Sequence, residues 1–374
     1  MENAVTDLYA NPDITMRSII QRIATGPELS KDISQEEARA GMSFILEGRA
    51  DPVQAAIFLI ALRMKRETDD EMKGLLDALL DVTQTVTAKV SDVVVLADPY
   101  DGYNRTIPSS PFLPAVLAEF DIHMVSEGVE SVGPKYGATH KQILRAAGVP
   151  VDLTPQQAAD RLADADIGWS YLDQSQFAPK LYGLMELRSK IVKRPALTTL
   201  DVLLGPLRGT HKTHLVTGYV HKPYPRIYSL LARHAKFDTC LLVRGVEGGV
   251  TPSLRQAGRC VYYHDMGEEI GLDLDPKELG IDQTMRAAPL PEDLPKSSRP
   301  GDEIAIAVDI DAMAKATADI GLRSLEGMLG PVRDGLIYTG ALVLFHLKRF
   351  DTLAKAAEAV TDVLDSGKAL ARVK

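Results

Sequence analysis

Short apolar runs alternate with helix-like segments through the middle of this chain, and this alternation limits the possible fold more than any other feature. The apolar runs, which we expect to be strands, span residues 93–97, 122–128, 214–220, 239–245 and 259–265. The helix-like segments span residues 112–120, 139–147, 156–163 and 225–235. Strands that alternate with helices usually lie parallel in one sheet that the helices cover. The sequence therefore predicts an α/β domain with a central, mainly parallel sheet.

The first ninety residues instead predict a small helical domain. Capping boxes start at Ser34 and at Thr68, and Asp51 precedes a first-turn proline, so three helix starts are marked. The helix after Asp51 carries residues 55–62, which are apolar on nearly every side. Such a helix has to pack against other apolar surface. We therefore expect these N-terminal helices to form a homodimer.

The length of 374 residues exceeds one average domain, so we expect two. We assign residues 1–91 to a helical domain and residues 92–179 and 205–374 to the α/β domain. A further helical stretch, residues 180–204, lies between the second and third expected strands. We expect it to return to the N-terminal helices and to make the helical domain discontinuous.

No apolar run approaches membrane-spanning length, and the first residues lack the basic and apolar regions of a secretory signal. We therefore expect a cytoplasmic protein with no membrane partner. The two cysteines, Cys240 and Cys260, have no metal-ligand spacing. Cys240 lies inside an apolar run, which is typical of a buried thiol.

Positive charge is concentrated in the middle of an acidic chain. The formal net charge is −9, yet residues 178–260 contain 14 Lys and Arg against 4 Asp and Glu. The simplest interpretation is a solvated basic face. The more specific one is a surface that binds phosphate groups or nucleic acid.

Residues 97–111 read as the end of a strand, a loop and the start of a helix. Gly102 lets the backbone approach a ligand closely, and Ser109 or Ser110 can cap a helix that begins at Pro111. Amide groups at a helix start favour an anion, so phosphate is one candidate. An ordinary strand-to-helix turn with a capping serine is the other interpretation.

Several segments resemble the anthranilate phosphoribosyltransferases, which share their fold with pyrimidine nucleoside phosphorylases. The similar segments are residues 33–72, FAP at 177–179, LLGPL at 203–207, GPVRDGLIYTGALVLF at 330–345 and DSGKAL at 365–370. They follow the family's order along nearly the whole chain. The resemblance implies a helical dimerisation domain, an α/β domain and a ligand cleft between the two.

The family's phosphate loop is altered here. Family members bind phosphoribosyl pyrophosphate and magnesium through a loop of the form GTGGDG, which corresponds to residues 97–102. Asp101 and Gly102 match, but Pro99 lacks an amide donor and Tyr100 adds bulk. Asp98 is expected to bring negative charge toward the phosphates. The loop is therefore poorly suited to pyrophosphate.

Three other family landmarks are also altered. The basic signature KHGNR corresponds to residues 126–130, SEGVE, and the acidic metal pair falls at Thr251 and Pro252, which carry no carboxylate. Val192 stands where an anthranilate-contacting arginine belongs, although Arg188, Lys190, Lys193 and Arg194 are close by. Each preorganised donor to departing pyrophosphate contributes about 3 kcal/mol, so ordinary anthranilate transfer is not expected.

A diverged branch of the same family is more similar at these places. DGYN at 101–104, TCLLVRGVEGG at 239–249 and ELRSKIVKR at 186–194 resemble that branch, whose members are implicated in nucleic-acid binding. The basic residues 178–260 agree with it, and the acidic chain as a whole agrees less well.

The first hypothesis is a protein that binds a phosphate-rich ligand, such as single-stranded nucleic acid, in the interdomain cleft. Lys190, Lys193 and Lys212 would help to neutralise phosphates, and Tyr100, Tyr103 and Tyr136 would stack on bases or simply fill turns. The candidate phosphate-binding residues are Asp101, Gly102, Tyr103, Asn104, Arg105, Ser109, Ser110, Lys135, Arg188, Arg194, Arg208 and Arg244.

The second hypothesis is an enzyme that transfers a pentosyl or phosphoribosyl group on another substrate. Asp101, Asn104, Arg105 and Ser109 would surround the phosphate, and Glu247 would hold a metal or position a hydroxyl, or else be a solvated loop acid. Magnesium is expected only in this case, and no catalytic residue is assigned. A regulatory or structural dimer with a vestigial cleft is the third possibility.

Overall fold

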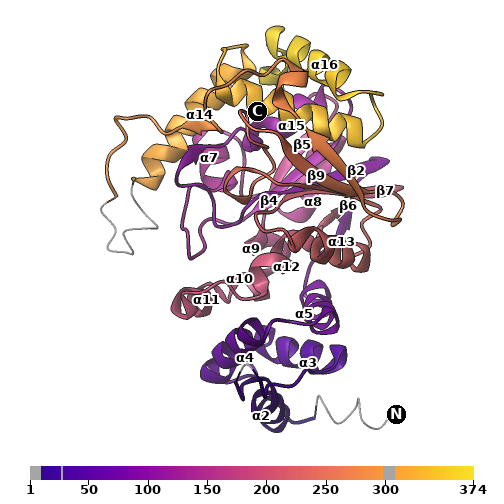
Figure 1. Ribbon diagram of the computed structural model, residues 1–374, viewed down its shortest axis with the longest axis vertical. Coiled ribbons are helices and arrows are strands. Elements are labelled where there is room, and N and C mark those ends of the chain that lie inside the picture. The colour runs from indigo at the N-terminus through magenta and orange to yellow at the C-terminus, as the bar shows by residue number, and fades with distance from the viewer. Residues whose placement is uncertain (1–9, 27, 298–307) are drawn as a thin grey trace.

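The computed structural model describes residues 10–26, 28–297 and 308–374. A group of N-terminal helices lies at one end of the molecule, and a larger α/β part lies at the other (Figure 1). Within the described ranges, no helix combines the length and apolarity needed to cross a membrane. The predicted combination of a helical domain with an α/β domain is confirmed.

The N-terminal group contains four helices, and three of them begin where the sequence places them. The four helices are α2 (Pro12–Ile23), α3 (Gln35–Leu46), α4 (Pro52–Lys65) and α5 (Asp69–Asp81). Both predicted capping boxes form, at Ser34 and at Thr68, and Asp51 accepts hydrogen bonds from the first turn of α4. Local capping chemistry therefore sets these helix starts.

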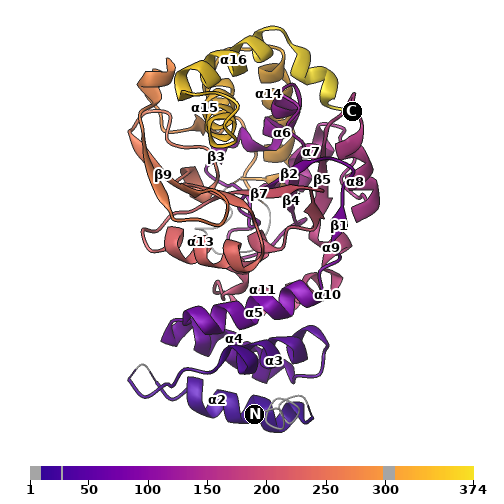
Figure 2. The same ribbon diagram turned by 90° about the vertical axis from the view of Figure 1, so that its right-hand side faces the viewer.

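A later segment of the chain packs against these helices (Figure 2). Its short helices are α9 (Gln174–Phe177), α10 (Pro179–Tyr182), α11 (Met185–Ile191) and α12 (Leu197–Leu200). Helix α11 contacts α4, and α12 contacts α5. The chain thus returns to the N-terminal helices before it re-enters the sheet.

The central sheet has seven strands in the order β10-β9-β8-β7-β2-β4-β5. The strands are β2 (Asp92–Ala97), β4 (Met124–Gly128), β5 (Trp169–Asp173), β7 (Lys212–Gly218), β8 (Thr239–Val243), β9 (Gly258–Tyr263) and β10 (Ile270–Leu274). The first five are parallel, and β9 and β10 are antiparallel. All five predicted strands are present, whereas β5 and β10 were not predicted.

Two small pairings hold the connections beside the sheet. Strand β1 (Val86–Thr87) pairs in parallel with β6 (Leu207–Arg208), and β3 (Thr106–Ile107) pairs antiparallel with β11 (Ala288–Pro289). The first pairing joins the two chain segments that connect the helical group to the sheet. Short 3-10 turns are η1 (Ser110–Phe112), η2 (Asp201–Leu203), η3 (Val246–Gly248), η4 (Pro276–Leu279) and η5 (Lys368–Arg372).

Helices cover both faces of the sheet, and alternate residues of each strand enter different cores. Val93 and Val95 of β2 pack with the N-terminal helices and with two covering helices, whereas Val94 and Leu96 pack with the C-terminal helices. The covering helices are α6 (Leu113–Ala118), α7 (His140–Ala146), α8 (Pro155–Ala163), α13 (Tyr224–His234), α14 (Ile310–Leu325), α15 (Pro331–His346) and α16 (Leu353–Asp365). This arrangement leaves the carboxyl ends of β2 and β7 facing the helical group.

Candidate ligand-binding site

A pocket of about 960 Å³ lies between the helical group and the carboxyl ends of β2 and β7. Arg63 and Met64 of α4 line it from one side, and Thr217 and Gly218 of β7 line it from the other. Other lining residues come from segments 98–101, 133–136, 219–228 and 247–248 of the α/β part, from segment 188–202, which packs on the N-terminal helices, and from residues 67–72. Ligands of open α/β sheets bind at the carboxyl ends of the strands, which is where this pocket lies.

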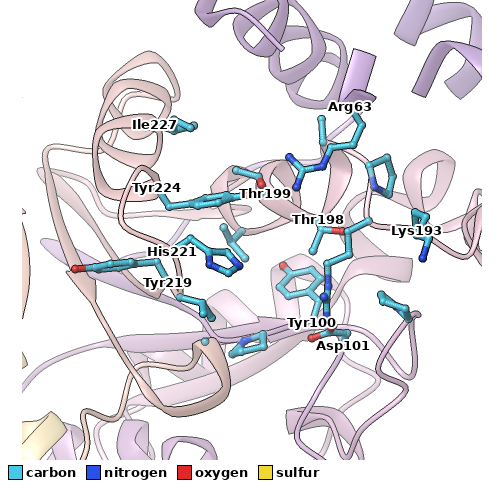
Figure 3. Close-up of a pocket in the computed structure, with 18 of the residues that line it drawn as sticks. Arg63, Tyr100, Asp101, Lys193, Thr198, Thr199, Tyr219, His221, Tyr224 and Ile227 are labelled. Carbon is cyan, nitrogen blue, oxygen red and sulfur yellow. Dashed lines mark hydrogen bonds and ion pairs between the residues drawn. The ribbon is translucent and has the colours of Figure 1, made fainter. Parts of the chain in front are cut away.

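Aromatic side chains line one part of the pocket. Tyr219, His221 and Tyr224 lie together on one side of the cavity (Figure 3). The rings of His221 and Tyr224 are 6.2 Å apart, and those of Tyr224 and Tyr228 are 5.8 Å apart. Flat rings of this kind stack on the faces of bases and other planar ligands.

Cationic side chains line the opposite part. Arg63 extends toward the cavity from α4, and Lys193 lies across the cavity from the aromatic side chains (Figure 3). Both side chains are exposed, and in the described part of the chain neither forms an ion pair. Arg194 pairs with Asp101 at 2.6 Å while half of its side chain stays exposed. The pocket thus offers positive charge that the protein does not neutralise.

Two polar atoms of the pocket residues are buried without a hydrogen-bond partner in the described structure. They are the hydroxyl of Thr198 and Oε1 of Glu67. Burial also raises the pKa of Glu67. Buried polar groups nearly always find a partner, so these atoms are positions where a ligand or water would bond.

The loop after β2 is organised by an internal carboxylate, Asp98. It accepts hydrogen bonds from the Tyr103 hydroxyl at 2.6 Å and from the backbone amide of Val250 at 3.0 Å, and His140 Nε2 lies 2.9 Å away. Burial alone would raise the pKa of Asp98, but these hydrogen bonds, above all that of His140, hold it below its ordinary value. Asp98 is therefore an ionised carboxylate that is 2% exposed and is surrounded mainly by donors of the protein itself, although it is also one of the residues that line the pocket.

The predicted capping role of Ser109 and Ser110 is also wrong. Neither side chain caps the turn η1 or the helix α6 that follows it. Ser110 instead donates to Asp98, and Ser109 shares a hydrogen bond of 3.1 Å with Thr251. Tertiary partners replace the local amides because this segment is buried under α15.

Gly102 has the left-handed conformation that its loop position suggested, with φ of +73°. A Cβ at this position would lie 2.5 Å from the carbonyl oxygen of Gly137. The glycine therefore allows two backbone segments to come together, residues 101–103 and 137–138, rather than backbone and ligand. Tyr103 and Ala138 exchange backbone hydrogen bonds at this contact.

Asp101 and Glu247 lie on either side of the Lys135 ammonium. The distances are 3.6 Å to Asp101 Oδ1 and 3.5 Å to Glu247 Oε2. Glu247 also accepts from the amide of Arg105 at 3.1 Å and from the Thr106 hydroxyl at 2.8 Å. Its side chain is only 9% exposed, so it is not a solvated loop acid.

Several predicted residues lie elsewhere. Arg188 touches the pocket, but its buried guanidinium is paired with Asp201 at 2.7 Å. Arg208 packs over the ring of Phe237 and donates to backbone carbonyls, away from the pocket. Arg244 is exposed and also lies outside the pocket. The predicted residues that line the pocket are Asp101, Arg188, Arg194 and Glu247; those that do not are Gly102, Tyr103, Asn104, Arg105, Ser109, Ser110, Lys135, Arg208 and Arg244.

The two residues at the positions of the family's acidic metal pair offer no carboxylate to magnesium. Thr251 uses its hydroxyl to contact Ser109 and Thr339, and Pro252 has no ligand atom in its side chain. Across the described ranges, no group of three or more His, Cys, Asp and Glu side chains could hold a metal ion. The acidic pair that the resemblance implies is therefore absent from these two positions.

Reasoning from sequence missed much of the pocket wall. Arg63, Glu67 and Thr198 come from segments that meet only in the folded chain. The aromatic cluster had a usable signal, because Tyr219 lies at the end of a predicted strand and His221, Tyr224 and Tyr228 follow within the next nine residues. Aromatic residues at the carboxyl end of such a strand would have been sound candidates.

Comparison with known proteins gives some matches that cover part of the chain and others that cover nearly all of it. Residues 17–83 match the helical bundle domain of a glycosyl transferase family. An uncharacterized protein from Aquifex aeolicus (strain VF5) is 29% identical over 252 residues, which cover 67% of this chain and 74% of that protein.

Longer matches are with anthranilate phosphoribosyltransferases. The protein from Rhodopseudomonas palustris (strain ATCC BAA-98 / CGA009) is 27% identical over 364 residues, covering 96% of this chain and 97% of its own. The crystal structure of the Thermus thermophilus protein aligns with a TM-score of 0.72 at 18% identity, covering 96% and 98% of the two chains. The Saccharomyces cerevisiae protein, in complex with PRPP and Mg, aligns with a TM-score of 0.73 at 14% identity, covering 96% of each chain.

Proposed function

The chain belongs to the family of the anthranilate phosphoribosyltransferases, and from this premise we propose that its interdomain pocket binds a phosphate-rich ligand, single-stranded nucleic acid. The observation that carries the proposal is that one cavity contains aromatic side chains on one side and cations without an ion pair on the other. The aromatic wall consists of Tyr219, His221, Tyr224 and Tyr228, and the cations are Arg63 and Lys193. Single-stranded nucleic acids are held by stacking on aromatic rings and by cations that follow the backbone.

The charge distribution supports the same ligand. Residues 178–260, which supply Lys193, Arg194 and most of the aromatic wall, contain 14 Lys and Arg against 4 Asp and Glu. Arg63 adds a cation from the helical side. A polyanion that enters the pocket would therefore contact positive groups from both parts of the molecule.

Classical anthranilate transfer is disfavoured by the phosphate loop itself. Pro99 provides no amide hydrogen, Tyr100 is buried where family members have a small glycine, and Asp98 ties the loop inward. Departing pyrophosphate needs preorganised donors and a metal, each donor being worth about 3 kcal/mol. Asp101 and Gly102 match the family's loop, but the basic signature and the acidic metal pair are replaced at the corresponding positions.

Fluorescence anisotropy with a labelled single-stranded oligonucleotide at two salt concentrations tests the proposal. We expect affinity to fall steeply with salt, because each phosphate that is neutralised releases counterions. The double variant Arg63→Ala with Lys193→Ala should lower the salt slope by about 2, since each phosphate contact contributes about one unit. Lys355→Ala on the distant helix α16 is the matched control and should leave the slope unchanged. A slope near zero for the unmodified protein would refute nucleic-acid binding.

The alternative function is pentosyl or phosphoribosyl transfer on a different substrate. The unpartnered hydroxyl of Thr198 favours it, because sugar hydroxyls pair readily with such a group. Calorimetry with phosphoribosyl pyrophosphate, with and without magnesium, and assays of nucleoside phosphorolysis test this function. Binding heat or turnover would support the transferase, and the absence of both would exclude it.

We also propose that the protein is a homodimer through its N-terminal helices. Val53 and Ile57 of α4 are 66% and 40% exposed and do not line the pocket. Their spacing of four residues places them on one face of the helix. An exposed apolar stripe on a helix that is already packed on its other side suits a second copy of the same surface.

A further inference from the structure

The ammonium of Lys135 lies between the carboxylates of two loops of the pocket, where a metal cation would also find oxygen ligands. Its ammonium lies 3.6 Å from Asp101 Oδ1, 3.5 Å from Glu247 Oε2 and 3.4 Å from the backbone carbonyl of Glu247. The Lys135 side chain is 14% exposed, and the two carboxylates are 7% and 9% exposed. Two carboxylates and a carbonyl are the oxygen ligands that calcium and magnesium prefer.

The two loops are built to keep this arrangement. Glu247 has φ of +54°, a strained conformation for a residue other than glycine, and its carboxylate accepts from the amides of Asn104 and Arg105. Asp101 is held on its other oxygen by Arg194 at 2.6 Å. Each carboxylate therefore has one oxygen directed at Lys135 and another held by a separate donor.

The charges of the cluster balance without a metal. Asp101 and Glu247 contribute two negative charges, and Lys135 and Arg194 contribute two positive ones. A divalent cation bound by the oxygens of Asp101 and Glu247 would lie next to the Lys135 ammonium. The two positive charges repel, so only one of them can occupy the place between these oxygens. Removing the ammonium would leave a buried pair of carboxylates with only one counter-charge, which is costly unless another cation enters.

We propose that Lys135 is a built-in replacement for a divalent cation, and that the Asp101–Glu247 pair becomes a divalent-cation site when this ammonium is removed. Thr251 and Pro252 offer no carboxylate to magnesium. The proposal explains this, because Lys135 of the chain itself supplies the positive charge. One consequence rests on the proposed function: nucleic-acid binding by this protein is independent of divalent metal.

Titration of the purified protein with calcium or magnesium chloride, by calorimetry and by thermal unfolding, tests the inference. The unmodified protein should give no binding heat and no shift of its melting temperature at millimolar metal beyond that of matched sodium chloride. Lys135→Met should bind the metal at least about tenfold more tightly than the unmodified protein and should melt at a higher temperature in its presence.

Two variants are matched controls. Lys135→Arg keeps a cation between the two carboxylates and should remain insensitive to metal, and adding Glu247→Gln to Lys135→Met should abolish the new site. Lys135→Gln replaces Lys135→Met if the latter does not fold. A Lys135→Met or Lys135→Gln protein that ignores divalent metal overturns the inference, as does metal binding by the unmodified protein that Glu247→Gln removes.

This titration contains no nucleic acid, so its outcome is separate from that of the anisotropy experiment. A second measurement joins the two: the oligonucleotide affinity of the unmodified protein with EDTA and with magnesium at equal ionic strength. Equal affinities support the inference. An affinity that depends on magnesium overturns it while leaving nucleic-acid binding itself established.

Discussion

Glu127 is a carboxylate that the protein buries without an ion pair among the described residues. It lies near the carboxyl end of β4, is 1% exposed, and has the Tyr100 hydroxyl as its polar neighbour. Burial raises its pKa to about 8. At neutral pH the folded protein therefore holds Glu127 as the neutral acid, whereas the unfolded chain releases this proton.

This difference predicts how stability changes with pH at one residue. Because the folded pKa is raised, the unfolded state loses the proton first, and the free energy of unfolding falls as pH rises from about 4.3 toward about 8. Glu127→Gln removes this loss and should stabilise the protein by on the order of 3 kcal/mol at pH 7, with little effect at pH 4.5. Urea unfolding of both proteins across this range measures the difference, and a gap that does not grow with pH would contradict the assignment.

Asp98 is also a buried carboxylate, but unlike Glu127 it has a lowered pKa and several hydrogen-bond donors. Its oxygens meet hydroxyl, amide and imidazole groups from four segments of the chain, so it stays ionised and joins the strand end to the loops around it. The sequence showed an acid beside a phosphate loop and could not show these partners, of which His140 and Val250 are distant in sequence. Burial and pairing decide what a charged residue does, and both arise only in the folded chain.

Helix α15 is joined to the sheet by a histidine at its last position. His346 Nε2 is 2.8 Å from the Thr239 hydroxyl, which lies 2.9 Å from His214 Nδ1. The ring of His264 stacks on that of His346 with centroids 4.8 Å apart. Burial first, and then the neighbouring positive groups, hold the pKa of His346 well below its ordinary value.

The junction should therefore weaken in mild acid. A lowered folded pKa means that the unfolded chain takes up the proton first, so stability is complete above about pH 6.5 and is lost below it by up to about 1.4 kcal/mol per pH unit. His346→Gln should reduce the slope of unfolding free energy between pH 7 and pH 5. The exposed His211→Gln is the control and should keep the full slope. Equal slopes for all three proteins would contradict the role of His346.

At the scale of elements, sequence predicted best what local chemistry controls. The capping boxes at Ser34 and Thr68 and the proline start at Asp51 were correct, because a cap involves only neighbouring residues. Five strands were found from their apolar, β-branched runs. Strand β5 was missed because its polar end is stabilised from afar, by an ion pair of 3.2 Å between Asp173 and Lys141.

The candidate site was less predictable than the fold. The resemblance identified the correct region, since Asp101, Arg194 and Glu247 do line the pocket. It could not show that Arg188 is neutralised by Asp201 or that Arg208 is directed elsewhere. These outcomes depend on which charged side chains contact one another in the folded chain, and a single sequence does not specify those contacts.

The two parts of the molecule are connected by side chains as well as by the backbone. Arg226 of α13 pairs with Asp69 of α5 at 2.8 Å, and His234 of α13 lies 2.6 Å from Asp77 of α5. Both pairs join the same two helices, one at the pocket and one beyond it. Exposed pairs contribute little stability, about 1 kcal/mol or less each, so they fix the relative position of the two helices more than they hold the parts together.

The proposed homodimer makes a prediction at the scale of the whole molecule. Val53→Glu combined with Ile57→Glu places charge on the α4 stripe, outside the pocket, and should shift the protein from dimer to monomer, because buried charges without partners oppose association. Sedimentation equilibrium measures the change. Leu329→Glu, at a residue that is 79% exposed and far from α4 in the chain, is the control and should leave the dimer intact. A monomeric unmodified protein would refute the proposal.

The packing of α11 on α4 and of α12 on α5 has a consequence for the time course of synthesis. The ribosome releases α4 and α5 long before it has made the two helices that cover them. During that interval their inner apolar residues, such as Phe58 and Leu75, lack part of their native surroundings. Emerging domains fold as units, so the earliest helices of this protein reach their final packing only after the first three parallel strands have been translated.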